Sequence, residues 1–327
     1  MNEKIQIFCG DCLELMKNIP DGSVDLVLTD PPYGTTACKW DSVIPFEPMW
    51  GELKRIVKRG GAIVLFGSEP FSSLLRASNI DWYKYDWIWE KPNGSGFLSA
   101  KKAPLKNHEN ISVFFQAPTD DTTNAFYSLK EYFQNEKQKS GLSSKQIQEL
   151  LGNYMQSHYF TSGTQFAIPN EKDYKKLQST GFWAKDYEEI KKEYEGAFNT
   201  YNPQFAEGKP YQCKQGRLAE VITGTSVGKS THITKSDGKR YPKTVLKFNK
   251  ETGSHPTQKP VDLLEYLINT YTNEGETVLD FTMGSGSTGV ACINTNRNFI
   301  GIEKDHTYFQ IAKNRLENVE VQMKMAL

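Results

Sequence analysis

The sequence has no long hydrophobic run and no excess of charge of either sign. None of its apolar stretches reaches the roughly 18 residues of a membrane-spanning helix, and the first residues, MNEKIQIFCGD, lack the apolar segment of a secretory signal peptide. Lysine plus arginine and aspartate plus glutamate number 39 each among 327 residues, so no overall field draws the chain toward a polyanion. We therefore expect a cytoplasmic protein, in which any contact with nucleic acid depends on a local cluster of charge.

Cysteine is also scarce. The five cysteines are an odd number, which suggests free thiols in a reducing compartment. Cys9 and Cys12 form a C-x-x-C pair, typical of a redox motif or of half a zinc site. No second Cys/His pair at ligand spacing accompanies them, because Cys38, Cys213 and Cys292 are solitary. We expect structural cysteines and no metal.

Short apolar runs alternate with amphipathic stretches along both ends of the chain. The runs predict strands at residues 5–9, 25–29, 62–66, 85–90, 111–115, 277–281 and 298–303. The amphipathic stretches predict helices at residues 12–18, 48–58, 70–78, 260–271, 287–295 and 306–319. This alternation predicts an α/β fold, a Rossmann-like, mostly parallel sheet of about seven strands with helices on both faces.

The pattern is interrupted in the middle, where the sequence becomes polar, tyrosine-rich and irregular and shows no internal repeat. We therefore expect one discontinuous domain, residues 1–117 plus 242–327, with a long insert at residues 118–241.

Asp30, Pro31, Pro32 and Tyr33 end the apolar run 24–29. The prolines fix φ and remove two N–H donors, so the carbonyls of this loop are free to accept hydrogen bonds. The carboxylate is a further acceptor, and the tyrosine ring offers a flat face for stacking. These groups suit a planar amino group on a ring, such as the exocyclic amine of a nucleobase. An ordinary proline-rich turn after a strand is the alternative.

A second motif follows the predicted strand 277–280. Gly284, Gly286 and Gly289 stand in the spacing G-x-G-x-x-G before a helix, where backbone N–H groups can approach a ligand closely. The next strand ends in Glu303, which is placed to accept hydrogen bonds from ribose hydroxyls. On this segment alone a nicotinamide-dependent oxidoreductase is an open alternative.

The Asp30–Tyr33 tetrapeptide resembles the (D/N/S)-P-P-(Y/F/W) loop of S-adenosylmethionine-dependent amino-methyltransferases. Residues 280–288 resemble the D-x-F-x-G-S-G-x-T segment of the same family, which binds the methionine part of the cofactor. The resemblance implies that Asp30, Pro31, Pro32 and Tyr33 are catalytic, with the Asp30 carboxylate and the Pro31 carbonyl accepting the amine hydrogens of a base flipped out of the duplex. Such bonding draws the amine lone pair out of the ring and makes it nucleophilic.

Shorter segments match the family in compatible order. They are His255–Pro260, Gly10-Asp11-Cys12, Asn107–Asn110 and Trp89–Pro92. Local alternatives exist for each; Asp11, for example, could simply cap a helix. The residues that the resemblance assigns to the cofactor are Asp11, Cys12, Thr257, Lys259, Asp280, Phe281, Gly284, Gly286, Ser287, Thr288 and Glu303.

The order of the motifs, with the catalytic loop first and the cofactor loop last, resembles the permuted β group of DNA amino-methyltransferases. The resemblance covers about residues 4–117 and 242–319, with Ser287 standing where the family usually has threonine. Asp30 favours adenine N6 as the target over cytosine N4, whose enzymes in this family more often carry serine there. The same resemblance allows a homodimer and a cognate restriction endonuclease as partners.

The insert is expected to recognise double-stranded DNA. Between residues 205 and 250, ten lysines and arginines face three acids, and a second basic loop spans residues 91–106. Solvated loops are the alternative reading of both. The expected DNA-binding residues are Lys91, Lys101, Lys102, Lys106, His108, Lys214, Arg217, Lys229, Lys239 and Arg240.

Residues 141–160 resemble a helix-turn-helix. Ser143 or Ser144 would cap its first helix, while Ile147, Leu150 and Leu151 would face its core. The element could contact DNA or simply pack.

One motif is misleading. Gly224–Ser230 is one residue short of a phosphate-binding P-loop, with Thr223 at the position that requires glycine. An ATPase is therefore not expected. A non-catalytic DNA-binding regulator and methylation of RNA or of protein amides remain open. If the substrate is DNA, we expect association with the nucleoid.

Overall fold

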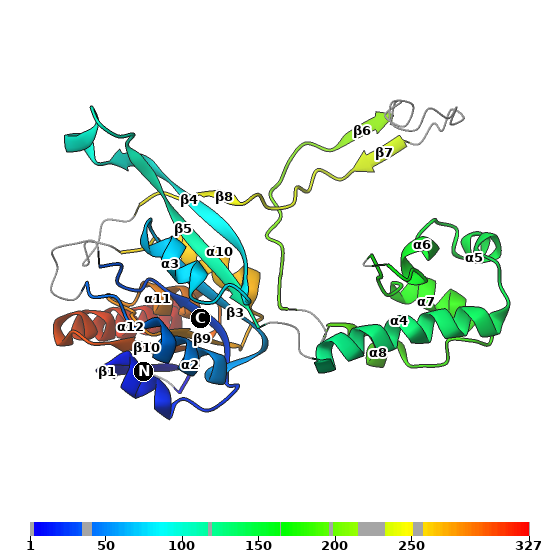
Figure 1. The fold of residues 1–327 in the computed structure, drawn as a ribbon, viewed down its shortest axis with the longest axis horizontal. Helices are drawn as coiled ribbons and strands as arrows, with labels where there is room; N and C mark the ends of the chain where they lie inside the picture. Colours follow the sequence, from blue (N-terminus) through cyan, green and yellow to red (C-terminus); the bar gives the residue numbers. More distant parts are fainter. Residues whose placement is uncertain are drawn as a thin grey trace.

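The computed structural model describes residues 3–34, 41–116, 120–163, 165–195, 199–214, 233–250 and 258–326. Its central feature is an eight-stranded sheet in the order β1-β10-β9-β2-β3-β5-β4-β8 (Figure 1). The strands are β1 (Ile5–Cys9), β2 (Val24–Thr29), β3 (Val57–Gly67), β4 (Tyr83–Ser95), β5 (Lys106–Phe115), β8 (Val245–Lys247), β9 (Thr277–Asp280) and β10 (Asn298–Glu303).

Strand direction determines which loops meet. β1, β10, β9, β2 and β3 are parallel, so their carboxyl ends share one edge of the sheet. β5 is antiparallel to β3 and to β4, so β4 runs with the parallel set and β5 begins at that same edge. The predicted α/β class with a mostly parallel sheet is confirmed. The eighth strand, β8, was not predicted; it has only three residues and pairs with β4 through Ile88–Glu90.

Helices cover both faces because successive side chains in buried strands point to opposite sides. In β3, Ala62, Val64 and Phe66 enter one core, and Ile63 and Leu65 enter the other. The first face is covered by α10 (Val261–Tyr271), α11 (Ser287–Asn294) and α12 (His306–Ala326). The second is covered by α1 (Cys12–Leu15), the 3-10 turn η1 (Met16–Asn18), α2 (Phe46–Ile56) and α3 (Phe71–Ala77).

β4 and β5 form a hairpin that is longer than the sequence predicts. Its strands reach Ser95 and Lys106, and the 3-10 turn η2 (Phe97–Ser99) lies at its tip. The proline-glycine composition of 92–96 reads as a turn, but the pairing of β4 with β5 shifts register between Glu90 and Ser95 and so accommodates Pro92. In Figure 1 the hairpin projects beyond the rest of the sheet.

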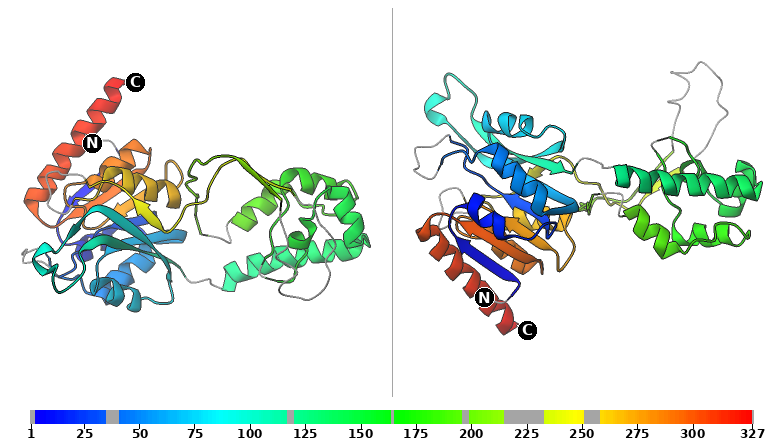
Figure 2. Two further views of the ribbon diagram at one scale, coloured as in Figure 1. Left: turned by 90° about the horizontal axis from the view of Figure 1, so that it is seen from above. Right: turned by 60° about the horizontal axis from the view of Figure 1, so that its bottom comes forward.

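A helical unit occupies the first part of the middle region. It consists of α4 (Asp120–Ser140), α5 (Ser144–Leu151), α6 (Gln156–Tyr159), α7 (Glu171–Gln178) and α8 (Tyr187–Glu195). It buries its own core, with Phe133, Ile147, Tyr174 and Trp183 among the fully covered side chains. Both views of Figure 2 place this unit beside the sheet rather than on either of its faces.

Only half of the expected helix-turn-helix is present. Ser143 caps α5 in a capping box with Gln146, and Ile147 and Leu151 are buried. The second helix, α6, is one turn of four residues, and its Tyr159 is buried beneath it. This helix is shorter than a recognition helix that lies along a DNA groove, and the buried residues of the pattern pack within the helical unit.

The chain leaves the sheet and returns to it at neighbouring points. Phe115 pairs with Ala62, and the Thr200 N–H donates to the Gly60 carbonyl at 3.0 Å. Asn202 then bonds the carbonyl of Thr270 at 2.7 Å. Beyond it lies a two-stranded ribbon, β6 (Tyr211–Lys214) with β7 (Ile233–Ser236). Among the described residues, no helix is both long enough and apolar enough to cross a bilayer.

Candidate active site

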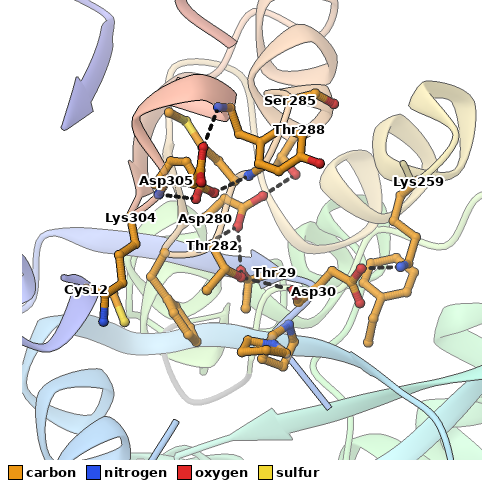
Figure 3. Close-up of a pocket in the computed structure, with 18 of the residues that line it drawn as sticks. Cys12, Thr29, Asp30, Lys259, Asp280, Thr282, Ser285, Thr288, Lys304 and Asp305 are labelled. Carbon is orange, nitrogen blue, oxygen red and sulfur yellow. Dashed lines mark hydrogen bonds and ion pairs between the residues drawn. The ribbon is translucent and has the colours of Figure 1, made fainter. Parts of the chain in front are cut away.

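A cavity of about 470 Å³ opens at the edge of the sheet where the parallel strands end (Figure 3). It brings together the loops after β1, β2, β9 and β10, which are far apart in sequence. The predicted residues that line it are Asp11, Cys12, Asp30, Pro31, Pro32, Tyr33, Lys259, Asp280, Phe281, Gly284, Ser287, Thr288 and Glu303. Thr257 lies outside the described residues. The predicted catalytic loop and glycine loop therefore face a single cavity.

Asp280 joins these two loops by hydrogen bonds. Its buried carboxylate accepts from the hydroxyl of Thr29, directly before Asp30, and from the hydroxyl of Thr288 at 2.6 Å. The hydroxyl of Thr282 donates to the Asp30 carbonyl at 3.0 Å. Burial raises the pKa of Asp280 to about 6, against the hydrogen bonds from Thr288 and Thr29 that lower it. Asp280 thus holds the predicted catalytic loop in place.

Asp30 is held from two sides. The Tyr33 hydroxyl donates to one carboxylate oxygen, and the Lys259 ammonium donates to the other. Burial raises the pKa of Asp30 and outweighs the opposing effect of Lys259. The Tyr33 ring packs against Phe71 with ring centroids 5.1 Å apart. The carboxylate is therefore fixed in direction at the cavity wall, while 23% of its side chain stays exposed.

A chain of alternating charges extends from Asp30 into the β4–β5 hairpin. Lys259 also lies 3.4 Å from a carboxylate oxygen of Glu109, and Glu109 in turn pairs with Lys91. Burial raises the pKa of Glu109, but Lys259 and Lys91 outweigh it and the net pKa is below the ordinary value. Burial lowers the pKa of Lys91. Four charges therefore neutralise one another beside the cavity.

Two of these lysines have partners that the sequence did not indicate. Lys259, expected to hold the cofactor, lines the cavity, and its buried ammonium pairs with the carboxylate of Asp30, 229 positions away. Lys91, expected to contact DNA phosphate, pairs with Glu109 on the neighbouring strand and lies over the Trp89 ring at 4.9 Å.

The opposite end of the cavity carries two acids. Glu303 accepts from the Gly284 N–H at 2.9 Å and from the Asp305 N–H at 2.7 Å, and burial raises its pKa. Asp11 caps α1 through the Leu13 N–H at 3.0 Å and forms an ion pair with Lys304, also at 3.0 Å. The capping alternative for Asp11 is therefore correct, and the same carboxylate also lines the cavity.

Gly286, expected among the cofactor-binding residues, lies at the start of α11. It precedes α11 with φ +78, and a Cβ there would lie 3.1 Å from the Ala312 Cβ of α12. It is not among the residues that line the cavity. Its role in the structure is to let the loop turn tightly beneath α12.

The other expected DNA-binding residues are dispersed. Lys101, Lys102 and His108 are exposed on the hairpin, and Lys106 reaches back to the Ser68 hydroxyl. Lys239 is exposed, whereas Arg240 donates to the Lys209 carbonyl and so joins the two segments that flank the β6–β7 ribbon. Arg217, Lys229 and the P-loop-like 224–230 lie outside the described residues, as does the side chain of Lys214.

Several cavity residues were not predicted. Thr29, Thr282, Lys304, Asp305 and Tyr308 all line it. Each directly adjoins or closely follows a motif at the end of a parallel strand, and strand ends are where ligands bind in such sheets. That rule could have extended the prediction by a few residues beyond each motif. Among the described residues, no cluster of three or more His, Cys, Asp or Glu side chains could hold a metal ion.

Comparison with known protein families shows which family the chain belongs to. A family model described as DNA methylase matches residues 24–314, which include both loops of the cavity. The chain belongs to the DNA methylase family of N6/N4 type. The resemblance seen in the sequence is confirmed, and the glycine loop is not that of a nicotinamide-dependent oxidoreductase. S-adenosylmethionine, the predicted cofactor, is the methyl donor of this family.

Individual DNA methylases resemble the chain either locally or along its length. The type II methyltransferase M2.DpnII of Streptococcus pneumoniae is 49% identical over 71 residues, which are 22% of this chain and 26% of the relative. The chain thus matches only about a quarter of that relative's length. The type II methyltransferase M.HpaI of Haemophilus parainfluenzae is 23% identical over 326 residues, 96% of this chain and 74% of the relative.

Among solved structures, the cytosine-N4-specific PvuII DNA methyltransferase superposes with a TM-score of 0.51 at 12% identity. The match covers 97% of this chain and 93% of that one. A similarity at this level concerns the fold alone.

Proposed function

We propose that this DNA methylase transfers a methyl group from S-adenosylmethionine to an exocyclic amine of a base flipped out of duplex DNA, and that the amine is adenine N6. One observation carries the proposal. The Asp30–Tyr33 loop and the glycine loop face the same cavity and are joined by the hydrogen bonds of Asp280 and Thr282. An acceptor for an amine thus stands beside a pocket for a nucleoside-type cofactor.

The cavity residues fit such a cofactor. Glu303 and Asp11 offer carboxylate oxygens at one end, suited to ribose hydroxyls and an adenine amine. The N-terminal turn of α11 and the hydroxyl of Ser287 lie at the glycine loop, where a carboxylate would be favoured. A volume of about 470 Å³ is in the usual range for small-molecule pockets. When bound, the cofactor supplies a methyl group on a positively charged sulfur.

The chain's own residues prepare the amine. The Asp30 carboxylate, oriented by Tyr33 and Lys259, accepts one N–H of the base, and the Pro31 carbonyl accepts the other. Both bonds localise the lone pair on nitrogen and point it at the methyl group. The Tyr33 ring, backed by Phe71, gives the base a face to stack on.

Adenine is proposed over cytosine from Asp30, because cytosine-N4 enzymes of the resembling group more often have serine there. The partner would be double-stranded DNA, read by the middle region 118–241 together with the β4–β5 hairpin. In keeping with the type II relatives, a cognate restriction endonuclease and a homodimer are further candidates. A DNA substrate would place the protein in the cytoplasm with the nucleoid.

The test is long-read sequencing of DNA from cells that express the protein, scored for N6-methyladenine and N4-methylcytosine. Cells that express Asp30→Ala are the control. We expect N6-methyladenine within one short sequence motif and none in the control. N4-methylcytosine would correct the target base, and unmodified DNA together with intact cofactor binding would favour a non-catalytic regulator or another methyl acceptor.

A further inference from the structure

The tip of the β4–β5 hairpin presents two apolar side chains that the described part of the chain leaves exposed. Phe97 is 69% exposed and the adjacent Leu98 is fully exposed. Isolated exposed apolar residues are ordinary, and Leu74 and Ile80 are examples here. Phe97 and Leu98 differ because they are consecutive and stand at the end of a projecting hairpin (Figure 1).

The direction of the hairpin places this tip on the side of the cavity. β4 runs with the parallel strands, so its carboxyl end extends past the edge at which Asp30 lies. β3 ends at Gly67, paired with Asn110, and the hairpin continues to the Ser95–Lys106 pair. Four further residues of β5 amount to about 13 Å. That reach exceeds the depth of the minor groove of B-DNA, about 7.5 Å.

The tip is built as an ordered turn. Gly96 adopts a left-handed conformation, and the Ser99 N–H donates to its carbonyl at 2.9 Å. The Lys102 N–H then donates to the Ser99 carbonyl at 2.8 Å. Below the turn, Leu105 packs closely over Gly94, and a Cβ added at position 94 would lie 2.9 Å from the Cβ of Leu105. Phe97 and Leu98 are therefore carried on an ordered turn above closely packed strands.

The charge around the tip indicates the partner. Residues 92–108 contain three lysines and no acid, and Lys101 and Lys102 are exposed directly beside the apolar pair. Such a tip fits a phosphate backbone with an apolar interior, which is duplex DNA. A second copy of the chain fits poorly, because two cationic tips would repel each other.

We propose that Phe97 and Leu98 form a wedge that enters the base stack of duplex DNA at the step opened by the departing target base, while Lys101 and Lys102 hold the flanking phosphates. The wedge rests on the proposed function, since it assumes a flipped base. It stabilises the opened duplex by filling the gap, and it need not read sequence.

The experiment compares methyl transfer by the full-length protein on two duplexes that carry the motif found by sequencing. One duplex is fully paired, and the other has an abasic site opposite the target base, so that less pairing and stacking must be broken. The variants are Phe97→Ala/Leu98→Ala, the charge variant Lys101→Ala/Lys102→Ala, and the matched control Leu74→Ala/Ile80→Ala. All six side chains are exposed, so each variant should fold.

We expect the Phe97/Leu98 variant to lose at least about tenfold in kcat/KM on the paired duplex, the equivalent of unstacking one base step. On the abasic duplex its loss should be under about threefold. With 2-aminopurine as the target base, the variant should show a weaker fluorescence rise on binding. The charge variant should lose equally on both duplexes, with a salt dependence shallower by about two counterions.

An equal loss for the Phe97/Leu98 variant on both duplexes, or no loss, overturns the wedge. An equal loss accompanied by a change in sedimentation would instead assign the tip to contact between copies. Failure of the proposed function looks different, because the wild-type protein would then methylate neither duplex.

Discussion

Replacing Lys259 with methionine tests whether a lysine keeps the catalytic carboxylate ionised. Lys259 pairs with Asp30 and lies near Glu109, and Glu109 retains Lys91 after the substitution whereas Asp30 retains no cation among its described contacts. Methionine keeps a long unbranched side chain, one heavy atom shorter than that of lysine, whose ammonium nitrogen lies 5.1 Å from the centroid of the Phe66 ring. The change therefore removes charge with little loss of volume.

The expected size follows from the pair's environment. Two unit charges about 4 Å apart interact by about 4 kcal/mol at an effective dielectric constant near 20. Since the side chain of Asp30 is 23% exposed, we reduce this to about 2 kcal/mol. Losing this interaction disfavours the charged form of Asp30 and so raises its pKa.

The assay is the pH dependence of methyl transfer at saturating cofactor and DNA, together with unfolding in denaturant. Burial already raises the pKa of Asp30, so losing Lys259 raises it further and moves the acid limb of the profile to higher pH. Activity lost near neutrality should return at alkaline pH. Lys175→Met, which breaks an exposed helix pair with Glu171, is the control and should leave the profile unchanged. An acid limb that does not move would refute the idea that Lys259 sets the state of Asp30.

Four further outcomes follow from the structure. Asp30→Ala should abolish methyl transfer but leave cofactor affinity within about threefold by calorimetry, because Asp30 is proposed to face the amine. An equal loss of transfer and of affinity would show that the catalytic loop has been assigned wrongly. Asp280→Asn should flatten the pH dependence of unfolding. The pKa of Asp280 in the folded protein, about 6, lies above the ordinary 3.8, so the free energy of unfolding of the wild type should fall by up to about 3 kcal/mol as pH rises from about 4 to 6. A variant with the same slope as the wild type would contradict this. Gly286→Ala should lower stability by about 1–2 kcal/mol through its positive φ, seen as a lower Tm without cofactor; loss of cofactor affinity alone would show direct contact. Replacing residues 117–198 by about six Gly/Ser residues should preserve cofactor binding but remove motif specificity, because the chain leaves and returns beside Ala62 and Gly60; an unfolded product would show that the helical unit supports the sheet.

The parts predicted from sequence are those encoded locally. The apolar run before Asp30 and the glycine loop before α11 each encode the end of a strand and the following turn within a dozen residues. The α/β class could therefore be predicted, and so could the position of both loops at the same cavity. The pairing of Lys259 with Asp30 joins residues 229 positions apart, and no local pattern encodes it. β8 is three residues within a polar stretch, held by its pairing with β4 rather than by its own propensity.

The second helix of the helix-turn-helix pattern is shorter than expected for a related reason. Apolar spacing shows which residues are buried, and it predicted Ile147 and Leu151 correctly. It does not show whether the next helix continues, and α6 ends after Tyr159. Tertiary packing of the aromatic residues in this unit decides its shape, and that information is spread over the whole unit.

The hydrogen bonds from the Thr29 hydroxyl to Asp280 and from the Thr282 hydroxyl to the Asp30 carbonyl span about 250 positions of the chain. A ribosome therefore releases the proposed catalytic loop long before it synthesises β9, the strand that ends in Asp280. Until then β2 lacks its β9 partner on one side. No nascent chain that ends before about residue 308 can form the complete cavity, so the proposed methyl transfer must begin after synthesis of the last strands. The same division suggests a split enzyme, in which two separately expressed pieces gain activity only when they meet.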